Sequence, residues 1–204
     1  MGQYNVEIGQ DIEKAADIIR NGGVVIYPTE TVYGIGANIF SEDALRKVFS
    51  FKKRTPEKPV SIAVSGFEMM EGLVYVSDRE RRFIEKFLPG PVTIILKKKK
   101  LVPGTLTSGK DMVGIRFPDH KMAVRLIELA GVPITSTSAN ISGEAPPTKA
   151  EEVRIKADYI LDGGECSGEP STVVDLAALK ILRKGAKYEE VAAVIEGNRN
   201  PFNS

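Results

Sequence analysis

The chain has 204 residues and a formal net charge of +1, with 42% hydrophobic and 27% charged residues. This composition is typical of a folded globular protein and argues against a disordered or fibrous one. One cysteine, Cys166, excludes an intramolecular disulfide, and one histidine, His120, leaves no Cys/His cluster for zinc. We find no signal peptide and no apolar run long enough to span a membrane, so we expect a cytoplasmic protein without a membrane partner.

Predicted helices and strands alternate along the first half of the chain. Asp11 precedes apolar residues at helical spacing, and Ser77 and Glu80 have the spacing of a capping box. In chain order, the sequence predicts a helix over residues 11–20, a strand over 24–27, a helix over 41–52, a strand over 60–64, a helix over 77–88 and strands over 92–96 and 112–117.

The second half continues the alternation. Thr148 and Glu151 form another predicted capping box. The predicted elements are a helix over residues 121–130, strands over 132–135 and 159–161, paired strands over 172–176 and 180–183, and a helix over 188–195. We expect residues 197–204 to form a loose tail. Because no linker interrupts the pattern, residues 1–204 are predicted to form one α/β domain with a mixed sheet.

Charge is distributed unevenly along the chain. Residues 1–45 carry two Lys/Arg and seven Asp/Glu, residues 46–125 carry eighteen and eight, and residues 126–204 carry eight and twelve. The basic middle segment favours binding of phosphates or nucleic acid. The alternative is that its lysines, including the run 97–100, only solvate exposed faces.

Two glycine-containing segments fail as nucleotide-binding motifs. Residues 104–111 nearly match a P-loop, but Asp111 stands where a Ser or Thr must hold magnesium, and a strand follows instead of a helix. Gly34 and Gly36 lack the third glycine of a dinucleotide fingerprint, since Ile39 stands there.

Polar residues gather where the prediction places loops and strand ends. The segments are residues 27–34, 52–59, 116–118, 135–143, 170–172 and 182–185. Hydroxyls, loop N–H groups and cationic side chains at such places can bind phosphate or carboxylate without a histidine. The alternative for each segment alone is an ordinary turn or helix cap.

Taken together, these segments resemble the YrdC/TsaC family of threonylcarbamoyl-adenylate synthases, over about residues 10–195. The motifs that carry the resemblance are Tyr27-Pro-Thr-Glu-Thr-Val-Tyr-Gly-Ile-Gly36, Lys52-x-Arg54, Pro89-Gly-Pro-Val-Thr93, Ser136-Thr-Ser-Ala-Asn-Ile-Ser-Gly143 and Pro170-Ser-Thr-Val-Val174. The resemblance implies a twisted mixed sheet flanked by helices, with a positively charged concave groove.

The resemblance also implies a reaction. L-Threonine, bicarbonate and ATP would give threonylcarbamoyl-AMP and pyrophosphate, and a partner transferase complex would pass the threonylcarbamoyl group to tRNA. Magnesium would accompany ATP, bound mostly by phosphates and water, so no protein ligands are assigned.

Residue roles follow from the same resemblance. Lys52 and Arg54 would be catalytic, against the ATP phosphates. The threonine site would comprise Thr31, Arg116, Ser136 and Ser171, and Lys58, Ser138, Asn140 and Arg183 would complete the ATP site. Arg116 would grip the threonine carboxylate. Purely structural roles remain open for Asn140, Thr29, Glu30 and Tyr33.

The chain departs from the family pattern at two positions. Thr55 separates Arg54 from Pro56, and Ala63 stands where long members have a histidine. We expect a short form without the extra C-terminal domain of long members.

Two other functions remain open. The first is a carbamoyl-adenylate-forming enzyme with a different acceptor, and the second is a YrdC-like paralogue that binds double-stranded RNA or tRNA.

Overall fold

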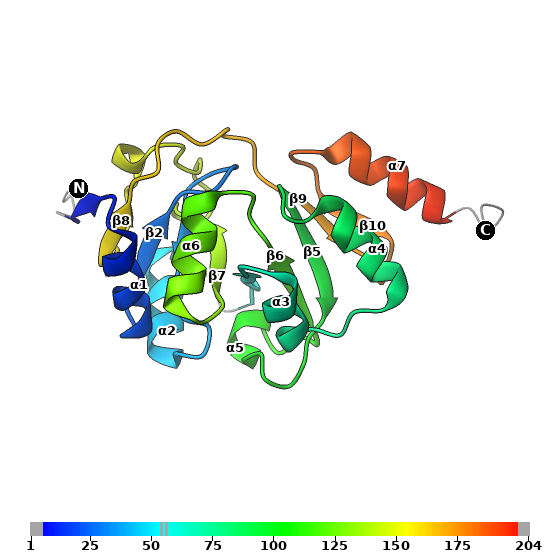
Figure 1. The fold of residues 1–204 in the computed structure, drawn as a ribbon, viewed down its shortest axis with the longest axis horizontal. Coiled ribbons are helices and arrows are strands. Elements are labelled where there is room, and N and C mark those ends of the chain that lie inside the picture. The colour runs from blue at the N-terminus through cyan, green and yellow to red at the C-terminus, as the bar shows by residue number, and fades with distance from the viewer. Residues whose placement is uncertain (1–5, 54, 56, 200–204) are drawn as a thin grey trace.

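The computed structural model describes residues 6–53, 55 and 57–199 (Figure 1). Its strands are β1 Ile8–Gly9, β2 Val25–Tyr27, β3 Gly34–Gly36, β4 Ser61–Ala63, β5 Val92–Lys97, β6 Met112–Arg116, β7 Ile134–Ser138, β8 Tyr159–Leu161, β9 Thr172–Asp175 and β10 Lys180–Arg183. Its helices are α1 Ile12–Arg20, α2 Glu42–Phe51, α3 Phe67–Leu73, α4 Asp78–Phe87, α5 Gly104–Thr107, α6 Lys121–Ala130 and α7 Tyr188–Arg199, with a 3-10 turn at Ala150–Glu152.

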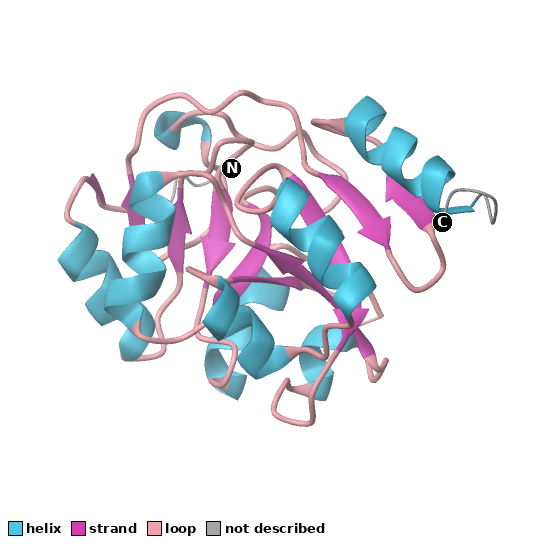
Figure 2. Cartoon of the chain, turned by 45° about the vertical axis from the view of Figure 1, so that its right-hand side comes forward, coloured by secondary structure: helices cyan, strands magenta, loops and turns pink. Residues whose placement is uncertain are grey.

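The strands form one ten-stranded sheet in the order β1-β8-β2-β3-β7-β4-β6-β5-β9-β10. Parallel pairs such as β4 with β6 and β5 with β9 lie beside antiparallel pairs such as β3 with β7 and β9 with β10. The strands cross the molecule as a twisted layer with helices packed against it (Figure 2). The mixed α/β prediction is therefore confirmed.

Local capping signals explain where the predicted helices begin. Asp11 accepts a hydrogen bond from the N–H of Lys14 (2.8 Å) at the start of α1. Ser77 and Glu80 form the expected capping box of α4, in which Glu80 Oε2 accepts from the N–H of Ser77 (2.8 Å). These bonds satisfy N–H groups that lack a partner within the helix.

The two halves of the sheet are covered differently. In the half around β2 and β8, α1 and α6 pack on one face and α2 packs on the other. In the half around β5 and β6, α3, α4 and α7 contribute to one core on a single face. Figure 1 shows α1, α2 and α6 grouped at one end of the sheet and α3, α4 and α7 toward the other. The second half therefore keeps one face open.

Several predicted boundaries need correction. β7 continues to Ser138, so Ser136 and Ser138 lie in a strand and not in a loop after it. Glu152, not Glu151, reaches back to the N–H of Thr148 (2.7 Å). Helix α7 continues to Arg199, so the predicted loose tail is wrong for residues 197–199, and residues 200–204 lie outside the described part.

None of the helices within the described ranges combines the length and the apolar character needed to cross a membrane.

Candidate active site

A cleft of about 670 Å³ lies on the open face of the sheet. Side-chain alternation creates this face: Ile94 and Ile115 point into the core, whereas Thr93 and Arg116 point the opposite way and line the cleft together with Gly114. Loops after β2 and β7 and residues near β9 and β10 form its walls. Segments distant in sequence therefore converge on one concave surface.

Arg116 is a buried cation at one side of this cleft. Its side chain is 4% exposed, and Nη2 lies 2.9 Å from Glu30 Oε1 and 3.4 Å from Thr31 Oγ1. Nη1 is buried without a hydrogen-bond partner among the described residues. Burial lowers the pKa of Arg116, and the charge of Glu30 opposes that change. Because buried N–H groups are normally paired, the free Nη1 marks a place for an anionic acceptor.

Hydrogen bonds fix the direction of the Thr31 hydroxyl. Thr29 Oγ1 donates its single proton to the carbonyl of Val32 (2.7 Å). Thr31 Oγ1 must therefore be the donor in its 2.9 Å bond to Thr29 Oγ1. Since Thr31 Oγ1 also accepts from Arg116 Nη2, it has one lone pair and no proton left for the cleft, which suits a ligand N–H.

Arg183 holds Ser171 on the opposite side. Its Nε and Nη2 donate to the Ser171 carbonyl (3.0 and 2.9 Å), and Nη2 also donates to Ser171 Oγ (2.8 Å). Ser171 Oγ lies 2.8 Å from Thr93 Oγ1. The pKa of Arg183 is lowered by burial and by the charge of Arg116. The positive charges of Arg116 and Arg183 repel each other, so an anionic ligand bound in the cleft would be stabilised by both.

Lys52 supports the end of β7 from below. Its side chain is buried, and Nζ donates to the carbonyls of Ser138 and Asn140 (2.9 Å for Asn140) and to Asn140 Oδ1 (3.3 Å). Ser138 Oγ donates to Asn140 Oδ1 as well. Asn140 Nδ2 donates to the carbonyl of Glu144 (2.6 Å). The ammonium therefore anchors the two residues predicted to contact the nucleotide.

The glycine pair beside the cleft has a packing role. A Cβ on Gly34 or Gly36 would lie 3.1 Å from the ring of Tyr27, which packs across both residues. Tyr27 is fully buried, and burial raises its pKa to about 12. Tyr33 faces the other way, into a hydrophobic cluster, and donates to the carbonyl of Gly164 (2.8 Å). Tyr33 is therefore a core residue.

The structure brings most of the predicted site residues together. The cleft is lined by Thr31, Arg116, Ser136, Ser138, Asn140, Ser171 and Arg183. Lys52 lies beneath its wall, and Lys58 is exposed on the loop before β4. Arg54 lies outside the described residues. The catalytic contacts of Lys52 and Arg54 with phosphate therefore stay predictions.

Sequence reasoning missed several polar residues of the cleft: Ser61, Thr93, Lys110 and Asp175. Thr93 carried a readable signal, because it is a polar residue inside an otherwise apolar strand. On a sheet with one face in the core, such a residue marks the opposite face.

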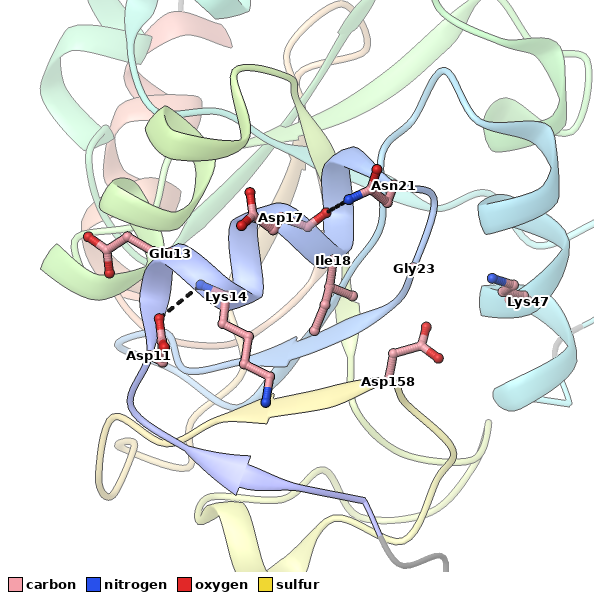
Figure 3. A pocket seen from close by; sticks show the side chains of 9 residues that line it. All are labelled: Asp11, Glu13, Lys14, Asp17, Ile18, Asn21, Gly23, Lys47 and Asp158. Carbon is pink, nitrogen blue, oxygen red and sulfur yellow. Dashed lines mark hydrogen bonds between the residues drawn. The ribbon is translucent and has the colours of Figure 1, made fainter.

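A second hollow, of about 620 Å³, lies beside α1 (Figure 3). It contains none of the predicted site residues. Asp11, which caps α1, and Asp158, which accepts from the N–H of Val24 (2.8 Å), both line it and serve the backbone. We assign this hollow a structural role.

Carboxylates in the cleft are sparse. Glu144 and Asp175 line it. Among the described residues, no group of three or more His, Cys, Asp or Glu side chains could hold a metal ion. The cleft residues themselves therefore offer few carboxylate ligands for a divalent cation.

Comparisons with known proteins agree on one family. The family model Sua5_yciO_yrdC, described as "Telomere recombination", matches residues 17–185. A threonylcarbamoyl-AMP synthase of Pyrococcus abyssi is 42% identical over 193 residues, which are 90% of this chain and 57% of that protein. A threonylcarbamoyl-AMP synthase of Cellvibrio japonicus is 35% identical over 179 residues, 84% of this chain and 94% of that protein.

The fold gives the same result. The crystal structure of P. abyssi Sua5 complexed with L-threonine matches with a TM-score of 0.83 and 38% identity, over 91% of this chain and 60% of that one. The chain thus spans somewhat more than half the length of these P. abyssi proteins and nearly all of the C. japonicus relative. Fold, motifs and sequence identity together establish that the chain belongs to the Sua5/YciO/YrdC family.

Proposed function

We propose that the protein is an L-threonylcarbamoyladenylate synthase, a nucleotidyltransferase that uses L-threonine, bicarbonate and ATP. The observation that carries this proposal is the buried Arg116 with its unpartnered Nη1, placed in one cleft with the hydroxyl and amide groups of residues 136–140. Support also comes from relatives named threonylcarbamoyl-AMP synthase and from a relative crystallised with L-threonine.

The amino acid would bind at the Arg116 side. The guanidinium would donate to the α-carboxylate from Nη1, a charge-assisted bond of the kind that suits arginine. Thr31 Oγ1, which has one lone pair and no proton left, would accept from the substrate nitrogen. Ser136 and Ser171 would complete this half of the site.

The nucleotide would bind along the end of β7. Asn140 would donate to it with its second Nδ2 proton, and Ser138 Oγ, whose own proton goes to Asn140 Oδ1, would accept from it. Arg183 would add positive charge, and Lys52 would keep the β7 end in place. We propose that Arg54 and Lys58, in the segment between α2 and β4, bind the phosphates. In this arrangement the acid end of the amino acid and the phosphates are held by different cations.

The chemistry requires mainly alignment and charge neutralisation. The threonine nitrogen adds to bicarbonate carbon with loss of water, which gives a carbamate. A carbamate oxygen then attacks the α-phosphorus of ATP, the bond between the α-phosphorus and the bridging oxygen breaks, and pyrophosphate leaves. Such a displacement needs positioned cations more than a catalytic histidine.

Magnesium would enter with ATP. With two carboxylates in the cleft and no larger ligand group among the described residues, we propose that phosphates and water supply most of its ligands. The ion would neutralise the departing pyrophosphate.

The product would serve tRNA modification. We propose that a transferase complex receives threonylcarbamoyl-AMP in the cytoplasm and that double-stranded RNA or tRNA can contact the basic part of the surface. Support for RNA contact is the excess of Lys and Arg over residues 46–125, of which Lys110 lines the cleft.

The test is incubation with ATP, Mg²⁺, bicarbonate and labelled L-threonine. We expect threonine-dependent pyrophosphate release and a labelled adenylate, detected by chromatography. Omission of bicarbonate and replacement of threonine by L-valine, which lacks the hydroxyl, are the controls. Pyrophosphate release that does not depend on threonine would favour a carbamoyl-adenylate enzyme with another acceptor. Complete absence of pyrophosphate release would refute the enzymatic proposal.

A further inference from the structure

Glu30 contacts Arg116 from outside the cleft. It lies in the loop after β2, its side chain is 19% exposed, and it is not one of the residues that line the cleft. Its Oε1 is 2.9 Å from Arg116 Nη2 and accepts from the N–H of Asp119 (3.0 Å). Its Oε2 is buried and has no hydrogen-bond partner among the described residues.

This contact joins one oxygen to one nitrogen. A carboxylate and a guanidinium commonly form two parallel bonds, which would occupy Nη1 as well. Here the N–H of Asp119 shares Oε1, so the carboxylate is turned and meets the guanidinium at Nη2 alone. Thr31 Oγ1 also contacts Nη2. Both partners therefore hold the same nitrogen, and the buried Nη1 is left without a hydrogen-bond partner among the described residues.

We propose that Glu30 is a positioning residue for the amino-acid site: it holds Arg116 in the orientation that presents Nη1 to the substrate carboxylate. The inference rests on the proposed function. Removal of Glu30 leaves a buried guanidinium free to rotate and without its counter-charge, which is costly in a site this enclosed. The substrate carboxylate would then meet a disordered donor, whereas the nucleotide contacts on β7 would be unchanged.

The test compares Glu30→Ala with Glu30→Gln, which keeps an acceptor for Nη2 and for the N–H of Asp119. Each variant is assayed with L-threonine and with L-threoninamide, which lacks the carboxylate charge. For Glu30→Ala we expect the KM for threonine to rise about 10- to 100-fold, the range for a hydrogen bond to a charged group. Its preference for threonine over the amide should fall by a similar factor, and the KM for ATP should stay within about twofold.

Glu30→Gln should restore most of the threonine affinity and of the preference over the amide. The matched control is Glu71→Ala, which removes an exposed ion pair with Arg81 (2.7 Å) on α3, away from the cleft. Should Glu30→Ala be too unstable to assay, Glu30→Asp takes its place, because the shorter side chain retracts from Nη2.

Three results would overturn the assignment: an unchanged KM for threonine in Glu30→Ala, an equal rise in the KM for ATP, or a Glu30→Gln variant as impaired as Glu30→Ala. A lower melting temperature alone would indicate a structural role and has the same consequence. If wild-type protein forms no adenylate with any amino acid, the proposed function fails together with this inference, and that result is seen before any variant is compared.

Discussion

The hydroxyl of Thr29 sets the polarity of its neighbourhood. Its proton goes to the carbonyl of Val32, and its oxygen accepts from Thr31. Thr29 is buried and does not need to touch a ligand to matter, because it determines that Thr31 is an acceptor toward the cleft. The hydrogen bond from Thr29 to the Val32 carbonyl thus makes Thr31 suitable for a ligand that donates a hydrogen bond.

Replacement of Thr29 by valine tests this polarity. Thr29→Val keeps the shape but leaves the carbonyl of Val32 and the hydroxyl of Thr31 without their partner. We expect a loss of about 1–3 kcal/mol in the free energy of unfolding and a higher KM for threonine. Thr29→Ser, which keeps the hydroxyl, is the control. Chemical denaturation and steady-state kinetics measure the two effects, and valine and serine variants that behave alike would contradict this interpretation.

Lys52 shows that a sequence can indicate which residues belong to a site without indicating the direction of their side chains. The family resemblance placed Lys52, Ser138 and Asn140 in one predicted ATP site, but a sequence does not specify where a long side chain points. The structure directs the ammonium to carbonyl oxygens at the β7 end. Burial of a lysine is normally tolerated only with such partners, so the direction of the side chain depends on packing that is not local.

At the scale of elements, close backbone contact joins the two sides of the Ser171 region. A Cβ on Gly185 would lie 2.1 Å from the carbonyl oxygen of Pro170, a distance no side chain can adopt. The N–H of Ala186 donates to that same carbonyl (2.9 Å), and Thr172 Oγ1 donates to the carbonyl of Ala186 (2.8 Å). Gly185 therefore lets the segment after β10 pack against the residues that lead into β9.

We expect Gly185→Ala to push these segments apart. The free energy of unfolding should fall by about 1–3 kcal/mol, as in overpacked sites, and the KM for threonine should rise because Ser171 is displaced. Gly197→Ala in α7 is the matched control: among the described residues, no atom beyond its own stretch of helix lies within 4 Å of the added Cβ, so it should stabilise the helix by about 0.5–1 kcal/mol. Denaturation curves check both, and a Gly185→Ala variant as stable as wild type would contradict the close-contact argument.

The elements that were predicted carry strong local signals, and those that were missed do not. Helix α6 matches its predicted range because apolar periodicity and the terminal Gly131, with φ of 67°, mark its length. Strand β3 was missed, since Gly34 and Gly36 disfavour strands and only pairing with β2 and β7 makes this segment extended. The two-residue strand β1 depends in the same way on β8.

At the scale of the whole molecule, the uneven charge distribution has a partly local explanation. Within the run 97–100, Lys98 Nζ donates to the carbonyl of Val102 (3.0 Å) and Lys99 Nζ to that of Glu71 (2.6 Å). These two lysines bind backbone carbonyls, a local role that neither the phosphate-binding interpretation nor the alternative of simple solvation predicted. Lys110, in contrast, lines the cleft.

The proposed RNA contact predicts how the affinity for RNA depends on salt concentration. If phosphates are neutralised by the basic segment, the affinity for double-stranded RNA should fall linearly on a log–log plot against salt, by roughly 40-fold between 50 and 200 mM for three contacts. Fluorescence anisotropy at several salt concentrations measures the slope. Affinity that does not change with salt would exclude a phosphate-driven interaction.

Strand β7 links the two covered regions of the sheet, because it pairs with β3 along one edge and with β4 along the other. Ser136 and Ser138, proposed to serve different substrates, are two residues apart on it, a spacing of roughly 6.6 Å set by extended backbone. If each serine contacts its proposed substrate, the extended backbone fixes the spacing between those two contacts. We then expect an amino acid with one additional carbon between carboxylate and nitrogen to present its carbamate out of line with the α-phosphorus, and so to be a poorer substrate.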